Sequence, residues 1–127
     1  MSFQHIVLWM DHHEARIFGL APNLVHKSKV KNDRHHFHRD HDSLGSRHER
    51  DRTYFAAVSE ALAETPEILL LGPGPARTEF LAWLQDHCPA QVKHVLGNAA
   101  CDDIADEELV AKGRHFFHAA DRMLPAR

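Results

Sequence analysis

Residues 5–10 read His-Ile-Val-Leu-Trp-Met, an unbroken apolar run typical of a central strand that is covered on both faces. The polar turn Asp-His-His-Glu at 11–14 separates this run from a second apolar segment at 15–20. After Ala-Pro-Asn at 21–23, residues 24–30 become polar at alternate positions, as expected for an edge strand. Links this short join antiparallel neighbours, so the first third of the chain predicts a three-stranded meander.

Downstream of the meander, helical and strand patterns alternate. A helical pattern over 53–63 precedes a second buried strand at 67–72, and Pro75 suits the first turn of the next helix. A last strand is predicted at 92–97, and a last helix, with acids in its first turn, at 106–119. The order β-β-β-α-β-α-β-α predicts an α/β fold, in which a mixed five-stranded sheet carries helices on both faces.

Length and composition limit the class of protein. The chain has 127 residues, which we expect to form a single domain, and 15 Lys and Arg against 18 Asp and Glu give a net charge of −3. No apolar run approaches the length of a membrane span, and the N-terminus lacks the pattern of a secretory signal. Two cysteines, Cys88 and Cys101, form no disulfide framework, so we expect a cytoplasmic protein with two ordinary buried thiols.

Histidine is enriched, and it gathers with positive charge in one segment. The chain has 13 histidines, six of them between His26 and Arg52. The same segment holds eight basic and five acidic residues, a charge of +3, which leaves −6 for the remainder. Residues 31–52 carry few large apolar side chains, so we predict a long His- and Arg-rich loop there.

The basic residues of this loop are candidates for contact with RNA phosphates. They are Arg34, Arg39, Arg47, Arg50 and Arg52. A further candidate is Arg77, which follows Gly72-Pro73-Gly74-Pro75 at the predicted start of a helix. The competing interpretation of that Gly-Pro sequence is a structural turn, because no Lys-Ser/Thr follows and two prolines remove N–H donors.

The histidines of the loop are candidates for a metal site. His35, His36, His38 and His41 could bind Zn²⁺ or another divalent transition metal through imidazole nitrogen. The alternative is a solvated insertion without any ligand. The sequence requires no cofactor, and it leaves self-association open.

Nuclease chemistry is disfavoured. Asp11 stands at the end of the first strand, where a two-metal nuclease would keep a carboxylate, but the strand at 67–72 ends in Gly-Pro-Gly and supplies no second one. Only Asp102 and Asp103 follow a neighbouring strand. We therefore expect Asp11 to be a turn residue.

Three stretches carry a resemblance to a known family. They are Val7–Phe18, Tyr54–Leu62 and Ile68–Phe80, which resemble the middle domain of archaeo-eukaryotic peptide-chain release factors and Pelota. The chain is also similar to small, histidine-rich bacterial proteins labelled translational machinery proteins. The resemblance implies a ribonuclease H-like fold and a partner that is RNA or the ribosome.

One departure from that family bears on activity. Release factors carry Gly-Gly-Gln between the third strand and the first helix, whereas residues 42–48 here read Asp-Ser-Leu-Gly-Ser-Arg-His. Only Gly45 matches, and no glutamine is near. The sequence therefore predicts a non-catalytic binding module that does not hydrolyse peptidyl-tRNA.

Overall fold

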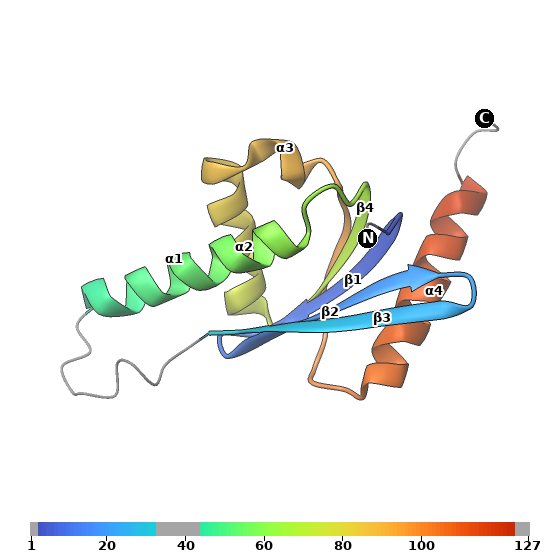
Figure 1. The fold of residues 1–127 in the computed structure, drawn as a ribbon, viewed down its shortest axis with the longest axis horizontal. Helices are drawn as coiled ribbons and strands as arrows, with labels where there is room; N and C mark the ends of the chain where they lie inside the picture. Colours follow the sequence, from blue (N-terminus) through green and yellow to red (C-terminus); the bar gives the residue numbers. More distant parts are fainter. Residues whose placement is uncertain (1–2, 33–43, 124–127) are drawn as a thin grey trace.

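The protein is built around a mixed five-stranded sheet (Figure 1). The computed structural model describes residues 3–32 and 44–123. The strands lie in the order β3-β2-β1-β4-β5, and they span β1 His5–Met10, β2 Glu14–Ala21, β3 Leu24–Lys31, β4 Glu67–Gly72 and β5 Val95–Ala100. The first three are antiparallel neighbours, and β4 and β5 join parallel to β1. The predicted meander and mixed sheet are confirmed.

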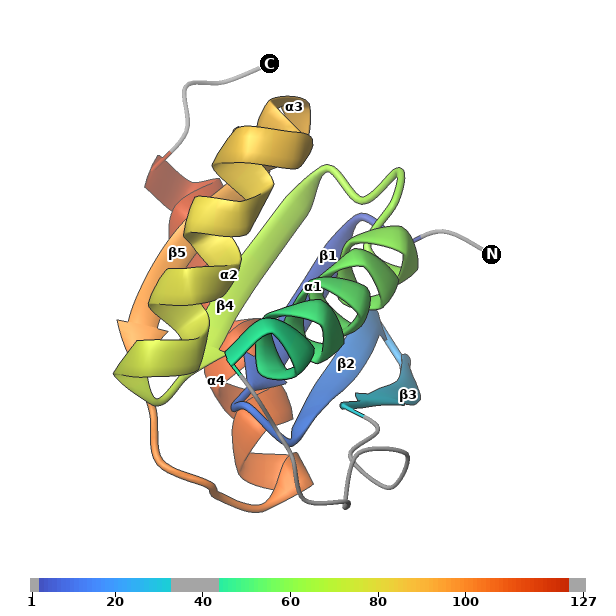
Figure 2. The same ribbon diagram turned by 90° about the vertical axis from the view of Figure 1, so that its left-hand side faces the viewer.

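The core has two halves because β1 and β4 are apolar on both faces. On one face, a cluster that includes Ile6, Leu8 and Leu70 packs beneath helices α1 (Leu44–Ala61) and α2 (Gly74–His87). On the other, Val7 and Trp9 pack with α4 (Asp106–Met123). Figure 2 shows α1 and α2 on one side of the sheet and α4 on the other. Helices cover both faces, as the sequence predicts.

Helix α1 begins at Leu44, nine residues before the predicted start, so the prediction of a loop through residue 52 is wrong for 44–52. The prediction rested on the lack of apolar residues in this segment. Helix formation does not require them, since Arg and Glu are good helix formers. The remainder of the predicted loop, residues 33–43, lies outside the described residues.

The last strand also starts later than predicted. Residues Pro89–Val92 form a short helix, α3, and β5 begins at Val95 rather than at residue 92. Pro89 fits the first turn of a helix, and Val92 packs against the α1 and α2 side of the core from there. The apolar residue that suggested a strand is therefore partly buried from a helix.

The two edges of the sheet differ. Edge strand β3 is exposed along most of its length and carries Lys27, Lys29 and Lys31, whereas β5 carries no charge and exposes Leu96. In the described part of the chain, no helix is long and apolar enough to span a membrane.

Candidate nucleic-acid interface

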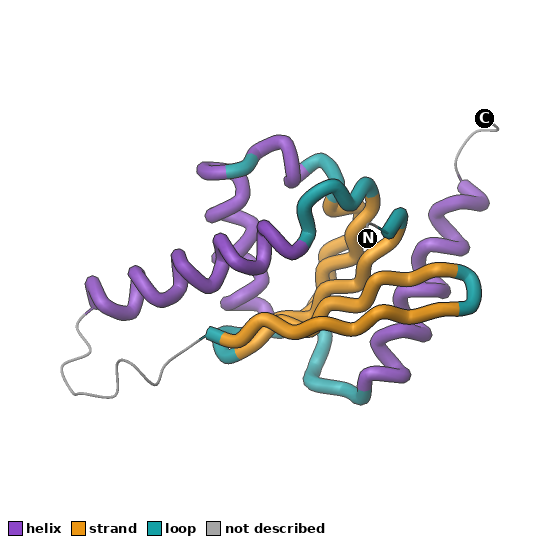
Figure 3. The backbone as a smooth tube through the Cα atoms, viewed as in Figure 1, coloured by secondary structure: helices purple, strands orange, loops and turns teal. Residues whose placement is uncertain are grey.

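The sheet end at which β1 and β4 finish gathers several polar contacts. It holds the turn between β1 and β2, the end of β3 and the middle of α1, and Figure 3 shows the turn and the end of β3 side by side. Asn32, the last residue described before residue 44, lies at this end of the sheet.

Asp11 organises the turn between β1 and β2. Its Oδ1 accepts hydrogen bonds from the backbone N–H groups of His13 at 2.8 Å and Glu14 at 2.9 Å. This is the geometry of a turn in which an aspartate caps its own backbone. The interpretation of Asp11 as a turn residue is confirmed.

Asn32 joins this turn to the end of β3 and to α1. Its side-chain nitrogen donates to the carbonyl of His12 at 2.9 Å and to Oδ1 of Asp51 at 3.0 Å. Its backbone N–H donates to the carbonyl of His13 at 2.9 Å. Asn32 is only 7% exposed, and a buried amide with these partners holds three elements in one arrangement.

Tyr54 anchors α1 to the same turn. Its hydroxyl donates to the carbonyl of Asp11 at 2.7 Å, and the side chain is buried. Burial raises the pKa of Tyr54 far above its usual value, and the negative charges of Asp11, Glu14 and Asp51 raise it further. The hydroxyl is therefore a permanent hydrogen-bond donor.

Gly72 lies where β4 connects to α2, next to the end of β1. It has a φ of 142°, and a Cβ atom there would lie 2.1 Å from the carbonyl oxygen of Met10. Nε of Arg77 donates to the Gly72 carbonyl at 3.1 Å, and the guanidinium also contacts Asn98. The Gly-Pro-Gly sequence forms a structural turn, and Arg77 fastens it; a phosphate contact by Arg77 stays a prediction.

The other predicted site residues fall in two groups. Arg47, Arg50 and Arg52 lie on α1, and the side chain of Arg52 is exposed. The remainder lie outside the described residues, and they are Arg34, Arg39, His35, His36, His38 and His41. Among the residues with described positions, no three His, Cys, Asp or Glu side chains gather in a geometry that could hold a metal ion.

Sequence reasoning missed a buried arginine on the other side of the sheet. Arg16 is 7% exposed, stacks over Trp9 at 4.4 Å, and pairs with Asp103 at 2.6 Å and Asp106 at 2.8 Å. The signal was present, since Arg16 is the only charge within the apolar segment 15–20. These pairs tie the loop before α4 to β2. The two thiols expected to be buried, Cys88 and Cys101, are free and only half-buried.

No protein-family model and no curated protein sequence matches the chain. Solved structures do match it. Pelota from Thermoplasma acidophilum matches with a TM-score of 0.58 and 24% identity over 85% of this chain, and Pelota from Archaeoglobus fulgidus matches with 0.56 and 15% over 87%. A third structure, described as an archaeal protein, matches with 0.58 and 13% over 94%. This chain spans 30%, 30% and 38% of those chains. At these identities the likeness shows a shared fold.

Proposed function

We propose that this domain is a non-catalytic module that binds RNA or the ribosome, with the basic half of α1 as its contact surface. The observation that carries the proposal is the fixed position of α1. Tyr54 and Asp51 attach the middle of the helix to the β1–β2 turn and to Asn32. A helix attached in this way keeps one position relative to the sheet, so its backbone loses little conformational freedom on binding.

The likeness to Pelota supports the same proposal. Two of the solved structures with this fold are Pelota proteins, one of the groups whose middle domain the sequence resembles. We therefore propose a translation-related role, a ribonuclease H-like classification and a cytoplasmic location. Membership of the small bacterial family of translational machinery proteins is also a proposal, and it rests on the sequence alone. Peptidyl-tRNA hydrolysis is not proposed, because Gly-Gly-Gln is missing.

Salt dependence tests the contact surface. Replacing Arg47, Arg50 and Arg52 with Ala removes three charges that would contact phosphates. The slope of log affinity against log salt should then flatten by roughly 2–3 units, at ~0.7–0.9 per phosphate. The measurement is RNA titration, together with ribosome co-sedimentation, at low and high salt.

The matched control removes charge elsewhere. Lys93 and Lys112 are exposed, and neither lies on α1. The variant K93A/K112A should leave the slope unchanged. An equal loss in the control, or no binding of the wild type at low salt, would refute the proposal.

Metal binding by the loop is the alternative proposal. It rests on the sequence cluster of His35, His36, His38 and His41. If a divalent metal is the ligand, replacing these four residues with Ala should abolish Zn²⁺ binding at pH 8, where imidazole is neutral, while the arginine variant keeps it. Calorimetry with ZnCl₂ decides this, and the absence of a defined stoichiometry would remove the alternative.

A further inference from the structure

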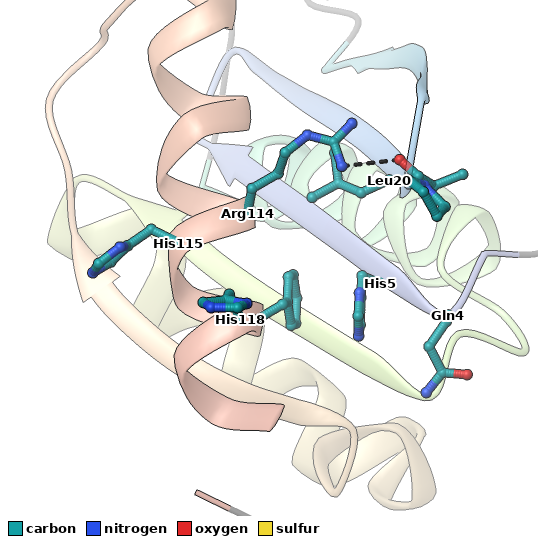
Figure 4. Close-up of a pocket in the computed structure, with 9 residues that line it drawn as sticks. Gln4, His5, Leu20, Arg114, His115 and His118 are labelled. Carbon is teal, nitrogen blue, oxygen red and sulfur yellow. Dashed lines mark hydrogen bonds between the residues drawn. The ribbon is translucent and has the colours of Figure 1, made fainter. Parts of the chain in front are cut away.

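A pocket of about 670 Å³ opens at the opposite end of the sheet from the proposed interface. It lies between the start of β1, the turn from β2 to β3 and the last turns of α4 (Figure 4). The interface borders Met10 and the pocket borders His5, which are ~17 Å apart along a strand with a rise of ~3.3 Å per residue. The two sites are therefore separate.

Arg114 supplies fixed positive charge to this pocket. One of its Nη atoms donates to the carbonyl of Ala21 at 2.9 Å, and the other lies 3.5 Å from the carbonyl of Leu24. Figure 4 shows the side chain reaching from α4 toward the end of β2. A guanidinium has five N–H donors, so Arg114 keeps donors for a ligand after these bonds are made.

An aromatic pair forms one wall. The ring of His5 stacks on Phe117 with centroids 4.2 Å apart and planes within 8°. Nε2 of His5 lies 2.8 Å from Oε1 of Glu67, which fixes the ring, and the His5 side chain is 23% exposed. The pocket therefore presents an oriented, partly exposed flat ring, against which another planar group can stack.

Three other polar side chains at the pocket are available to a ligand. Gln4, His115 and His118 line the pocket, and no hydrogen bond or ion pair joins their side chains to any other part of the chain that the structure describes. Among the side chains that the structure describes, no carboxylate lines the pocket, and Glu67, which contacts the lining residue His5, is paired with it. The described lining is thus rich in N–H donors.

We propose that this pocket binds a nucleoside phosphate, either free or at the end of an RNA strand. Arg114 and the imidazoles of His115 and His118 match the phosphate, since guanidinium and imidazole N–H groups form charge-assisted hydrogen bonds to phosphate oxygens. The stacked rings match the planar base, and the volume lies within the range of small-molecule sites. This binding goes beyond the proposed interface on α1 and does not depend on it.

Calorimetry with two probes tests the proposal. Inorganic phosphate reports the anion site alone, and adenosine 5′-monophosphate reports the phosphate together with the base. The nucleotide should bind more tightly than phosphate. The variant R114Q should weaken nucleotide binding at least about tenfold, as expected for the loss of a charge-assisted hydrogen bond.

The matched control is K112Q. Lys112 lies on the same helix, is exposed, and does not line the pocket, so its loss removes an equal charge and should leave nucleotide affinity unchanged. Equal weakening in K112Q and R114Q, or equal affinity for phosphate and nucleotide, would overturn the proposal. So would the absence of nucleotide binding to the wild type.

A second variant guards against misfolding of R114Q. The side chain of His118 is exposed, so the H118A variant should fold normally and should still bind the nucleotide more weakly than the wild type. Amide resonances of Leu20, Ala21 and His118 should shift on titration with the nucleotide. Shifts confined to α1 would contradict the proposal.

Binding of short RNAs distinguishes an RNA end from a free nucleotide as the ligand. If the pocket takes an RNA end, a 5′-phosphorylated tetranucleotide should bind more tightly than the mononucleotide, and its 5′-hydroxyl form should not enter the pocket. If the pocket takes a free nucleotide, the mononucleotide should bind best. The R47A/R50A/R52A variant should keep mononucleotide binding in full, so failure of this proposal and failure of the α1 interface give different results.

Discussion

Gly72 ends β4 in a conformation that other residues adopt only under strain. With a φ of 142° and no room for a Cβ atom beside Met10, G72A must distort the corner where β1, β4 and α2 meet. We expect a loss of roughly 1–3 kcal/mol in the free energy of unfolding. Denaturant unfolding measures it. G74A is the matched control, because a Cβ at Gly74 meets nothing within 4 Å. Equal stability of the two variants would contradict the strain at Gly72.

Leu70 fills the centre of the core beneath α1 and α2. It is 0% exposed and belongs to the same cluster as Leu8 and Phe80. The variant L70A should lose roughly 2–5 kcal/mol in the free energy of unfolding, because the cavity it leaves has rigid walls. A loss below about 1 kcal/mol on denaturant unfolding would mean that the core relaxes around the site.

Asp106 makes stability depend on acid pH. Its hydrogen bond to Lys27 is the main cause of a lowered pKa; its bond to Arg16 and the charges of Lys27 and Arg16 lower the pKa further, and burial opposes them. A carboxyl whose pKa is lower when folded stabilises the fold above its ordinary pKa of ~3.9, and this contribution is lost as the pH falls through the folded pKa. D106N should be less stable than the wild type at pH 7, and the difference should close as the pH falls below ~4. Unfolding curves between pH 7 and pH 2 test this, and a difference that does not change with pH would contradict it.

Among the elements, α1 is joined to the sheet end by a buried residue outside the helix. Asn32 bonds to Asp51 and to the β1–β2 turn, so N32A leaves buried polar groups without a partner. We expect a loss of roughly 1–3 kcal/mol in stability and weaker RNA binding, although no positive charge is removed. An unchanged salt slope with reduced affinity would show that Asn32 positions α1. Unchanged affinity would show that the position of α1 does not affect RNA binding.

The elements also show which parts of the fold the sequence could predict. β1 and β4 were predictable to the residue because both faces are buried, and their apolar runs have sharp ends. The start of α1 was not, because a basic segment with few apolar residues has the same composition whether it forms a helix or a loop. Val92 was misassigned for a related reason, since a single partly buried valine fits a strand and a short helix equally well.

For the molecule as a whole, the polar site was harder to predict than the core. Asn32 and Tyr54 lie 22 positions apart in the sequence, and both bond to the β1–β2 turn because the fold brings the end of β3 and the middle of α1 beside it. No local sequence pattern predicts contacts between residues so far apart. The pocket beside Arg114 has the same origin, since His5 and His118 come from opposite ends of the chain.

The missing Gly-Gly-Gln leads to a prediction for the whole molecule. We expect no peptide release when the protein is added to programmed ribosomes, because the glutamine that would enter the peptidyl-transferase centre is absent. A release assay with labelled peptidyl-tRNA measures this. Release that disappears in G45A would contradict the assignment as a non-catalytic module.

The directions of β1 and α4 decide where the molecule can be held in an experiment. β1 starts, and α4 finishes, at the pocket end of the sheet, while the start of α1 and the Asp11 turn lie toward the other (Figure 1). A tether to a sensor surface through residue 3 or residue 123 therefore leaves the basic helix pointing into solution. The same tether crowds the opening beside Arg114. Immobilised protein should capture RNA normally and respond weakly to mononucleotides, whereas a label placed on α1 should reverse that preference.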